Sequence, residues 1–233
     1  MDCRPPRALE DYLAVATDYD GTIAHDGVVD EHTLDALRRL RTAEMRLLLV
    51  TGRELSSLAI AFPHLNLFDR VVAENGALLY DPAAGTSQWL APPPPPALLD
   101  ALRSKGVPFS AGRSIVATVE PYEHDVLTAI HDLGLEWHVI FNKGAVMALP
   151  SGVTKATGLR PALIELEIPA DRTVAVGDAE NDHAFLGRCG LAVAVANALP
   201  ALKERADIVT VGARGEGFTE LAERLLARRN GDR

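Results

Sequence analysis

The sequence contains little cysteine and has no long apolar run. Only two cysteines, Cys3 and Cys189, occur among 233 residues, too few for a disulfide framework or a cysteine-based metal cluster. No apolar stretch approaches the roughly 20 residues that a membrane-spanning helix requires. The first residues also lack the apolar segment of a signal peptide. We therefore expect a cytoplasmic protein with reduced thiols and no membrane association.

Positive charge is scarce as well. The formal net charge is −9 at pH 7, with 23 lysines and arginines against 32 aspartates and glutamates. Such a chain lacks the basic surface on which nucleic acids and anionic membranes bind, so neither is expected as a partner. A phosphorylated ligand would also be repelled at long range. Any phosphate site must therefore depend on a local group of donors and a cation.

Apolar runs and helix-like patterns alternate in the first third and the last third of the chain. The runs at 12–17, 46–50 and 70–73 are typical of buried strands. Segments 31–44 and 54–62 have the spacing of helices, and the alternation resumes near residue 155. This pattern predicts an α/β fold with a Rossmann-like parallel sheet and helices on both of its faces.

The composition and the pattern of the sequence change between residues 85 and 150. A run of five prolines, Pro92–Pro96, precedes a helix-like segment, where proline fits the first turn. Farther on, Asn142-Lys143-Gly144 separates two strand-like runs and favours a hairpin turn. We expect residues 85–150 to form a small inserted α+β cap domain. Residues 1–84 and 151–233 would then form the core.

Four polar clusters follow predicted strands or begin predicted helices. In an open parallel sheet, ligands bind beyond the carboxyl ends of the strands, so clusters far apart in sequence can converge there. The four clusters are Asp18-Tyr19-Asp20-Gly21-Thr22, Thr51-Gly52-Arg53, Lys155 and Gly177-Asp178-Ala179-Glu180-Asn181-Asp182.

The acidic residues of these clusters, Asp18, Asp20, Asp178 and Asp182, would repel one another if they met. Each like-charged pair about 4 Å apart costs about 4 kcal/mol at an effective dielectric constant near 20. One lysine, Lys155, cannot offset that repulsion. Mg²⁺ binds carboxylates together with water and substrate phosphate. The constellation therefore predicts Mg²⁺ as cofactor and a phosphoryl group as ligand.

The same clusters contain groups that could carry out phosphoryl transfer. A carboxylate such as Asp18 can attack phosphorus and form an aspartyl-phosphate. Lys155, the Thr51 hydroxyl and the backbone near Gly52 would neutralise or bind the phosphoryl oxygens. Asp20 is placed to protonate the leaving alkoxide and then to activate water.

Together these motifs resemble those of the haloacid dehalogenase superfamily of phosphatases. The segment DYDGT resembles the D-x-D-G-T signature, and Thr51, Lys155 and GDAEND resemble the second, third and fourth motifs. The pairs TGR and ENGA (Glu74–Ala77), with a cap between the second and third motifs, resemble the Cof-type, class IIB branch. The short cap is similar to those of phosphoglycolate and mannosyl-phosphoglycerate phosphatases.

The resemblance implies a role for each matching residue. Asp18 would be the nucleophile and a metal ligand, and Asp20 the acid/base and a metal ligand through its backbone carbonyl. The substrate would be a small phosphorylated sugar or acid. The remaining assignments are metal ligation by Asp178 and Asp182, and phosphate binding by Thr51, Gly52, Lys155 and Asn181.

The sequence leaves the roles of some residues undecided and allows more than one function. Arg53 and Asn75 fit substrate contact and structural support equally well. In the cap, a solvated face would have the same composition as a substrate-binding face. The cap residues concerned are Arg113, Glu120, His138 and Lys143. Besides hydrolysis, a phosphotransferase or phosphosugar mutase, or a non-catalytic receiver-like regulatory domain, would use acidic residues, Thr and Lys around Mg²⁺.

Overall fold

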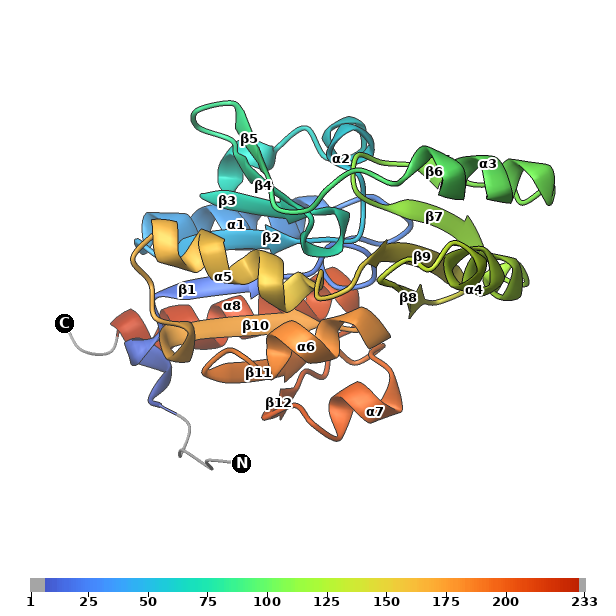
Figure 1. Cartoon of the computed structure of the whole chain (residues 1–233). Coiled ribbons are helices and arrows are strands. Elements are labelled where there is room, and N and C mark those ends of the chain that lie inside the picture. The colour runs from blue at the N-terminus through green and yellow to red at the C-terminus, as the bar shows by residue number, and fades with distance from the viewer. Residues whose placement is uncertain (1–6, 231–233) are drawn as a thin grey trace.

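The computed structural model describes residues 7–230, so Cys3 lies outside the described residues. Its larger sheet has the strand order β12-β11-β10-β1-β2-β3-β4-β5 (Figure 1). The strands β4 and β5 are antiparallel to their neighbours, and the other six run parallel. The bounds are β1 (Ala14–Thr17), β2 (Arg46–Val50), β3 (Arg70–Ala73), β4 (Leu78–Asp81), β5 (Thr86–Trp89), β10 (Thr173–Gly177), β11 (Leu191–Ala194) and β12 (Ile208–Val209).

Helices cover both faces of this sheet. One face packs against α1, α2 and α8, and the other against α5, α6 and α7 (Figure 1). This arrangement confirms the α/β fold expected from the alternating pattern. The bounds are α1 (Glu31–Thr42), α2 (Leu55–Ala61), α5 (Lys155–Glu165), α6 (His183–Leu186), α7 (Pro200–Lys203) and α8 (Arg214–Asn230).

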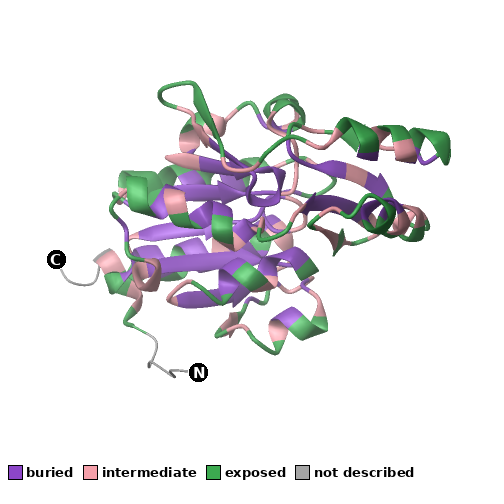
Figure 2. Cartoon of the chain, viewed as in Figure 1, coloured by how far each residue is buried: buried purple, intermediate pink, exposed green. Residues whose placement is uncertain are grey.

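Burial on both faces explains why the central strands read as unbroken apolar runs. Alternate side chains of a strand point to opposite faces of the sheet. In β2, Leu47 and Leu49 pack with α1 and α8, whereas Leu48 and Val50 pack with α5. All four are at most 1% exposed. Figure 2 shows the resulting layer of buried strands between more exposed helices.

The insert is a second, antiparallel sheet with the order β6-β7-β9-β8, packed against two helices. It lies beyond the carboxyl ends of the parallel core strands (Figure 1). None of the helices within residues 7–230 is long and apolar enough to cross a membrane. The bounds are α3 (Pro96–Ser104), β6 (Ser110–Ala111), β7 (Val116–Val119), α4 (Glu123–Asp132), β8 (Trp137–Asn142) and β9 (Ala145–Pro150).

The edge strand β5 differs from the expected organisation. It lies within residues 85–150, yet it pairs with β4 and extends the core sheet. Its four residues, Thr86–Trp89, are all exposed, so the strand has no apolar alternation that would reveal it in the sequence. The division at residues 85 and 150 stays a prediction, and the pairing of β5 would move its first boundary past Trp89.

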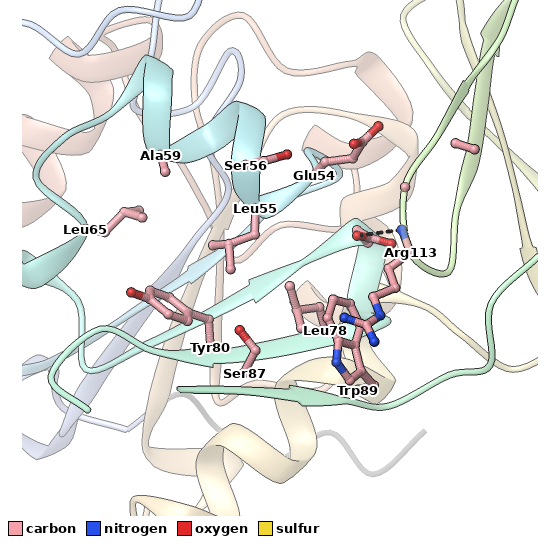
Figure 3. A pocket seen from close by; sticks show the side chains of 13 residues that line it. Glu54, Leu55, Ser56, Ala59, Leu65, Leu78, Tyr80, Ser87, Trp89 and Arg113 are labelled. Carbon is pink, nitrogen blue, oxygen red and sulfur yellow. Dashed lines mark hydrogen bonds between the residues drawn. The ribbon is translucent and has the colours of Figure 1, made fainter. Parts of the chain in front are cut away.

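Core and insert are joined by a buried carboxylate. Glu74 follows β3 and is 3% exposed. It accepts hydrogen bonds from the backbone N–H of Arg113 at 3.1 Å and of Ser114 at 2.8 Å, both in the loop between β6 and β7. In Figure 3 a dashed line marks the bond at Arg113, beside a cavity of about 600 Å³ that residues of α2, β4 and β5 line. Glu74 therefore fixes one end of the insert to the core.

Replacing Glu74 by glutamine is expected to destabilise this junction. Hydrogen bonds to an ionised group contribute about 1.5–3 kcal/mol, and an amide offers only one acceptor oxygen for two N–H donors. We expect Glu74→Gln to lower the free energy of unfolding by about 1–3 kcal/mol in urea titrations. The control is Glu54→Gln, because Glu54 lines the same cavity without a hydrogen bond to the insert. Equal stability of the two variants would contradict this role.

Candidate active site

The parallel strands deliver three motif residues to one edge of the sheet. Asp18 directly follows β1, Thr51 follows β2, and Asp178 follows β10. These strands are neighbours and run in the same direction, so their carboxyl ends lie together. Lys155 is the first residue of α5, which packs on one face of the sheet. That helix starts there because the Thr154 side chain accepts a hydrogen bond from the backbone N–H of Thr157.

Lys155 is the buried centre of the site. Its ammonium donates to Asp18 Oδ1 and to Asp182 Oδ1, both at 2.6 Å. Lys155 is 1% exposed, Asp18 3% and Asp182 0%. Burial raises the pKa of Asp18 to about 8, although Lys155 acts in the opposite direction. Burial acts to lower the pKa of Lys155, but the two carboxylates raise it above its usual value, so the lysine stays charged.

Both carboxylate oxygens of Asp182 accept hydrogen bonds. Oδ1 accepts from Lys155, and Oδ2 accepts from the backbone N–H groups of Asp178 and Ala179 at 2.8 and 2.9 Å. The loop can close this tightly because residue 177 is glycine: a methyl group there would lie 2.7 Å from Asp182. Asp182 thus fixes both the loop after β10 and the ammonium of Lys155.

Asp178 is fully buried and has several partners. Its Oδ2 accepts from Asn197 Nδ2 at 3.2 Å and from the ammonium of Lys143, and its Oδ1 accepts from Thr22 at 3.4 Å. Burial raises the pKa of Asp178, and the hydrogen bond from Lys143 acts in the opposite direction. Gly21 has φ +82°, and any side chain there would collide with Asp178. The glycine of the DYDGT motif therefore lets the first and fourth motifs approach each other.

Asp20 points toward a different partner. Arg53 binds it with two hydrogen bonds, from Nε to Oδ2 at 2.7 Å and from Nη2 to Oδ1 at 2.6 Å. The Arg53 guanidinium also lies 5.1 Å from the centre of the Tyr19 ring. The structure shows Arg53 supporting Asp20, whose carboxylate it neutralises and orients, and a contact of Arg53 with substrate stays a prediction.

Thr51 and two asparagines, Asn75 and Asn181, form a further polar part of the site. The Thr51 hydroxyl accepts from the N–H of Arg53 at 3.1 Å, which leaves its own proton free for a ligand. Asn75 lies near Gly52: a methyl group at that glycine would lie 3.3 Å from the Asn75 amide. Asn181 Nδ2 donates to Asn75 Oδ1 at 2.9 Å, whereas its own buried Oδ1 has no partner among the described residues. Asn181 thus contacts Asn75, and its free oxygen is available to a ligand.

The structure places the four candidate residues of the cap in four different environments. Lys143, at the tip of the β8–β9 hairpin, enters the site and contacts Asp178. The guanidinium of Arg113 lies 4.1 Å from the centre of the Trp89 ring, at a cavity that none of the acidic site residues lines (Figure 3). His138 lies near the return to the core, and burial lowers its pKa, while the backbone of Pro150 and Val153 acts in the opposite direction. Glu120 is exposed.

Sequence reasoning missed Asn197. Besides its bond to Asp178, its Nδ2 donates to the carbonyl of Gly21 at 2.8 Å, and its Oδ1 accepts from the N–H of Arg214 at 2.7 Å. It thereby joins the first and fourth motifs to the start of α8. The available signal was its position just after β11, at the same edge of the sheet as Asp18 and Asp178.

The residues present fit a magnesium ion. Carboxylate oxygens of Asp18, Asp178 and Asp182 lie within 4.8 Å of one another. Three buried carboxyl groups face two lysines, Lys155 and Lys143, so the site is negatively charged once all three are ionised. An all-oxygen, negatively charged donor set suits a hard divalent cation. These groups are consistent with a metal site.

Asp18 makes the stability of the metal-free protein depend on pH. Its pKa of about 8 lies above the value near 4 of an unfolded aspartate, so the folded state keeps a proton that the unfolded state loses. The stability contributed by this proton is present at low pH and is lost as the pH rises to about 8. We therefore expect the stability of the wild type relative to Asp18→Asn to fall between about pH 4 and about pH 8. Urea unfolding in EDTA measures this, and a difference independent of pH would contradict it.

Fold and site define the class of protein: an α/β enzyme core with an acidic, lysine-containing site beneath an inserted cap. The chain belongs to the haloacid dehalogenase-like hydrolase family, whose model matches residues 15–88 and 113–220. This match confirms the resemblance seen in the motifs. It makes the chain a phosphatase-family enzyme, so the non-catalytic receiver-like alternative is set aside.

Named relatives and solved structures agree with this assignment. The chain is 30% identical over 227 residues to phosphoglycolate phosphatase 2 of Saccharolobus solfataricus, covering 92% of this chain and 93% of that protein. It is 32% identical over 228 residues to phosphoglycolate phosphatase of Methanothermobacter thermautotrophicus, covering 91% and 98%. A haloacid dehalogenase-like hydrolase from Bacteroides thetaiotaomicron superposes with a TM-score of 0.77 at 19% identity, covering 92% and 99%, which supports the fold alone.

Proposed function

We propose that this phosphatase hydrolyses a small phosphorylated carboxylic acid such as 2-phosphoglycolate, through an aspartyl-phosphate on Asp18 and with Mg²⁺. The observation that carries the proposal is the buried carboxylate of Asp18, paired with Lys155 and grouped with Asp178 and Asp182. The substrate class comes from the relatives, which are named phosphoglycolate phosphatases.

Each residue has a defined task in the proposed reaction. The free oxygen of Asp18 attacks phosphorus, and the P–O bond to the leaving alcohol breaks as Asp20 supplies a proton to that oxygen. Asp20 then takes a proton from water, which attacks the phosphorus of the aspartyl-phosphate and releases phosphate with the Asp18 carboxylate restored. Lys155 and the Thr51 hydroxyl bind phosphoryl oxygens during both steps.

The acidic group would hold the metal. Asp18 and Asp178 would supply side-chain oxygens, with Asp182 close by and the Asp20 backbone carbonyl as a further ligand. Bound Mg²⁺ would offset the charge of the phosphoryl oxygens against the carboxylates. To act as the acid, Asp20 must carry a proton on an oxygen that faces the leaving group while Arg53 binds the other oxygen, so we assign Arg53 a positioning role.

The proposed function is tested by phosphate release from 2-phosphoglycolate with Mg²⁺ and with EDTA. 2-Hydroxyethyl phosphate serves as the matched substrate, because it has the same size and lacks the carboxylate. We expect metal-dependent release, with 2-phosphoglycolate preferred. Absence of release from a panel of phosphorylated acids and sugars by the folded, Mg²⁺-loaded protein would contradict hydrolysis.

Phosphotransfer to a second alcohol, as in a phosphosugar mutase, would use the same aspartyl-phosphate. Hydrolysis in water enriched in ¹⁸O separates the two reactions, because only attack by water places one solvent oxygen in each released phosphate. We expect one labelled oxygen per phosphate. Transfer of unlabelled phosphoryl groups to an added sugar would instead support the transferase.

A further inference from the structure

The hairpin tip between β8 and β9 places a cation of the insert inside the acidic site. Lys143 stands at this turn with φ +48°, and its ammonium donates to Asp178 Oδ2. Among residues 7–230, this is the ion pair that connects the insert to the core; the other ion pairs of the insert stay within it. This contact therefore links the hairpin tip directly to the acidic site.

The two lysines of the site are held very differently. Lys155 is 1% exposed and is bound by two carboxylates, so it is a permanent part of the core. The side chain of Lys143 is 42% exposed and has one carboxylate partner. A lysine ammonium is a point charge on a flexible stem, and it can leave such a partner without disturbing the backbone.

Asp178 keeps its position without Lys143. Asn197 and Thr22 bind its two oxygens from the core, and the backbone N–H of Asp178 itself is bound by Asp182. The oxygen that accepts from Lys143 is therefore a preformed cation ligand. In this structure it is paired with an ammonium, although it also belongs to the group of carboxylates that fits a divalent cation.

We propose that Lys143 is a displaceable counter-ion: it neutralises Asp178 in the metal-free protein, and the divalent cation replaces it there. Binding of the metal and release of the hairpin tip would then be coupled, because both involve the same oxygen of Asp178. The freed ammonium stays at the mouth of the site, where its next partner is the carboxylate of the substrate. This last step rests on the proposed function, whereas the exchange itself does not.

The exchange is tested first by calorimetric titration of the metal-free protein with MgCl₂. Removing a competing cation must tighten metal binding, so we expect Lys143→Met to bind Mg²⁺ about tenfold more tightly than the wild type. Lys143→Arg keeps the charge and is expected to stay close to the wild type. Lys105→Met is the matched control, because Lys105 pairs with Asp125 within the insert at 3.6 Å. Unchanged or weaker binding by Lys143→Met would overturn the proposal.

A second readout follows the lysine in the wild-type protein. Acetylation by an amine-reactive ester, measured residue by residue by mass spectrometry, reports how accessible each ammonium is. We expect the rate at Lys143 to rise severalfold on addition of Mg²⁺ while the rate at Lys105 stays constant. An equal rate at Lys143 with and without Mg²⁺ would show that the pair persists and would overturn the exchange.

The substrate step is tested by comparing two esters in the same variants. Lys143→Met is expected to lower kcat/KM for 2-phosphoglycolate about tenfold relative to 2-hydroxyethyl phosphate, mainly through KM. An unchanged ratio would overturn the contact between Lys143 and the substrate carboxylate. If the wild type hydrolyses neither ester, the proposed function fails, while titration and acetylation still decide the exchange.

Discussion

Asp18→Asn is expected to abolish phosphate release while leaving the protein folded. An asparagine amide has nearly the shape of the carboxylate but cannot attack phosphorus, so the covalent step is lost. We expect kcat to fall by about 10³-fold or more, measured as phosphate release with saturating Mg²⁺. Circular dichroism and urea unfolding should show a folded protein, because asparagine has nearly the shape of the protonated carboxyl that burial favours at this position.

The matched control is Asp26→Asn. Asp26 has a side chain that is 93% exposed, and its ion pair is with the neighbouring His25. It has a positive φ of 51°, a conformation that asparagine adopts readily. Its activity should equal that of the wild type. Substantial turnover by Asp18→Asn under the same conditions would show that another group attacks phosphorus.

Much of the core could be predicted because its strands are buried on both faces. Arg46–Val50 and Arg70–Ala73 form strands with the bounds read from the sequence, since apolar runs of that length in an alternating pattern have few other structures. The edge strand Thr86–Trp89 has no such signal. Its position is determined by pairing with β4, which is a tertiary property.

The positions of the motifs could likewise be predicted from the sequence, but the contacts between their side chains could not. Asp18 and Asp178 could be placed at one edge of the sheet because each directly follows a strand of the core. The pairing of Asp20 with Arg53 depends on side-chain orientation, and the contact of Lys143 with Asp178 depends on where the insert lies over the core. Lys143 and Asp178 are 35 positions apart and follow strands of two different sheets, so no local pattern in the sequence records their contact.

The contacts of Asp20 and Lys143 share a physical feature. Asp20 and Asp178 each pair with a long cationic side chain that is partly exposed, whereas the pair of Lys155 with Asp18 is sealed from solvent. The site therefore combines a buried ion cluster at its base with partly exposed ion pairs at its mouth. We expect substitutions at the mouth to change metal and substrate binding, and substitutions at the base to change stability as well.

Lys155→Met tests the base of the site and is expected to cause the largest loss of stability. Removing one partner of a buried ion pair leaves an uncompensated charge and costs about 3–5 kcal/mol. Here two carboxylates, Asp18 and Asp182, lose their common partner. We expect the free energy of unfolding in urea and EDTA to fall by about 3–5 kcal/mol, against little change for the surface variant Lys105→Met.

The cause of that loss can be separated from simple misfolding by relieving the repulsion. At a pH high enough to ionise Asp18, one of the unpaired carboxylates is gone in Asp18→Asn/Lys155→Met, so the double variant should be more stable there than Lys155→Met alone. Mg²⁺ should stabilise Lys155→Met more than it stabilises the wild type, because a cation that binds only the folded state then compensates an otherwise unpaired charge. If neither the second substitution nor Mg²⁺ restores stability, the loss comes from packing around the Lys155 side chain instead of from its charge.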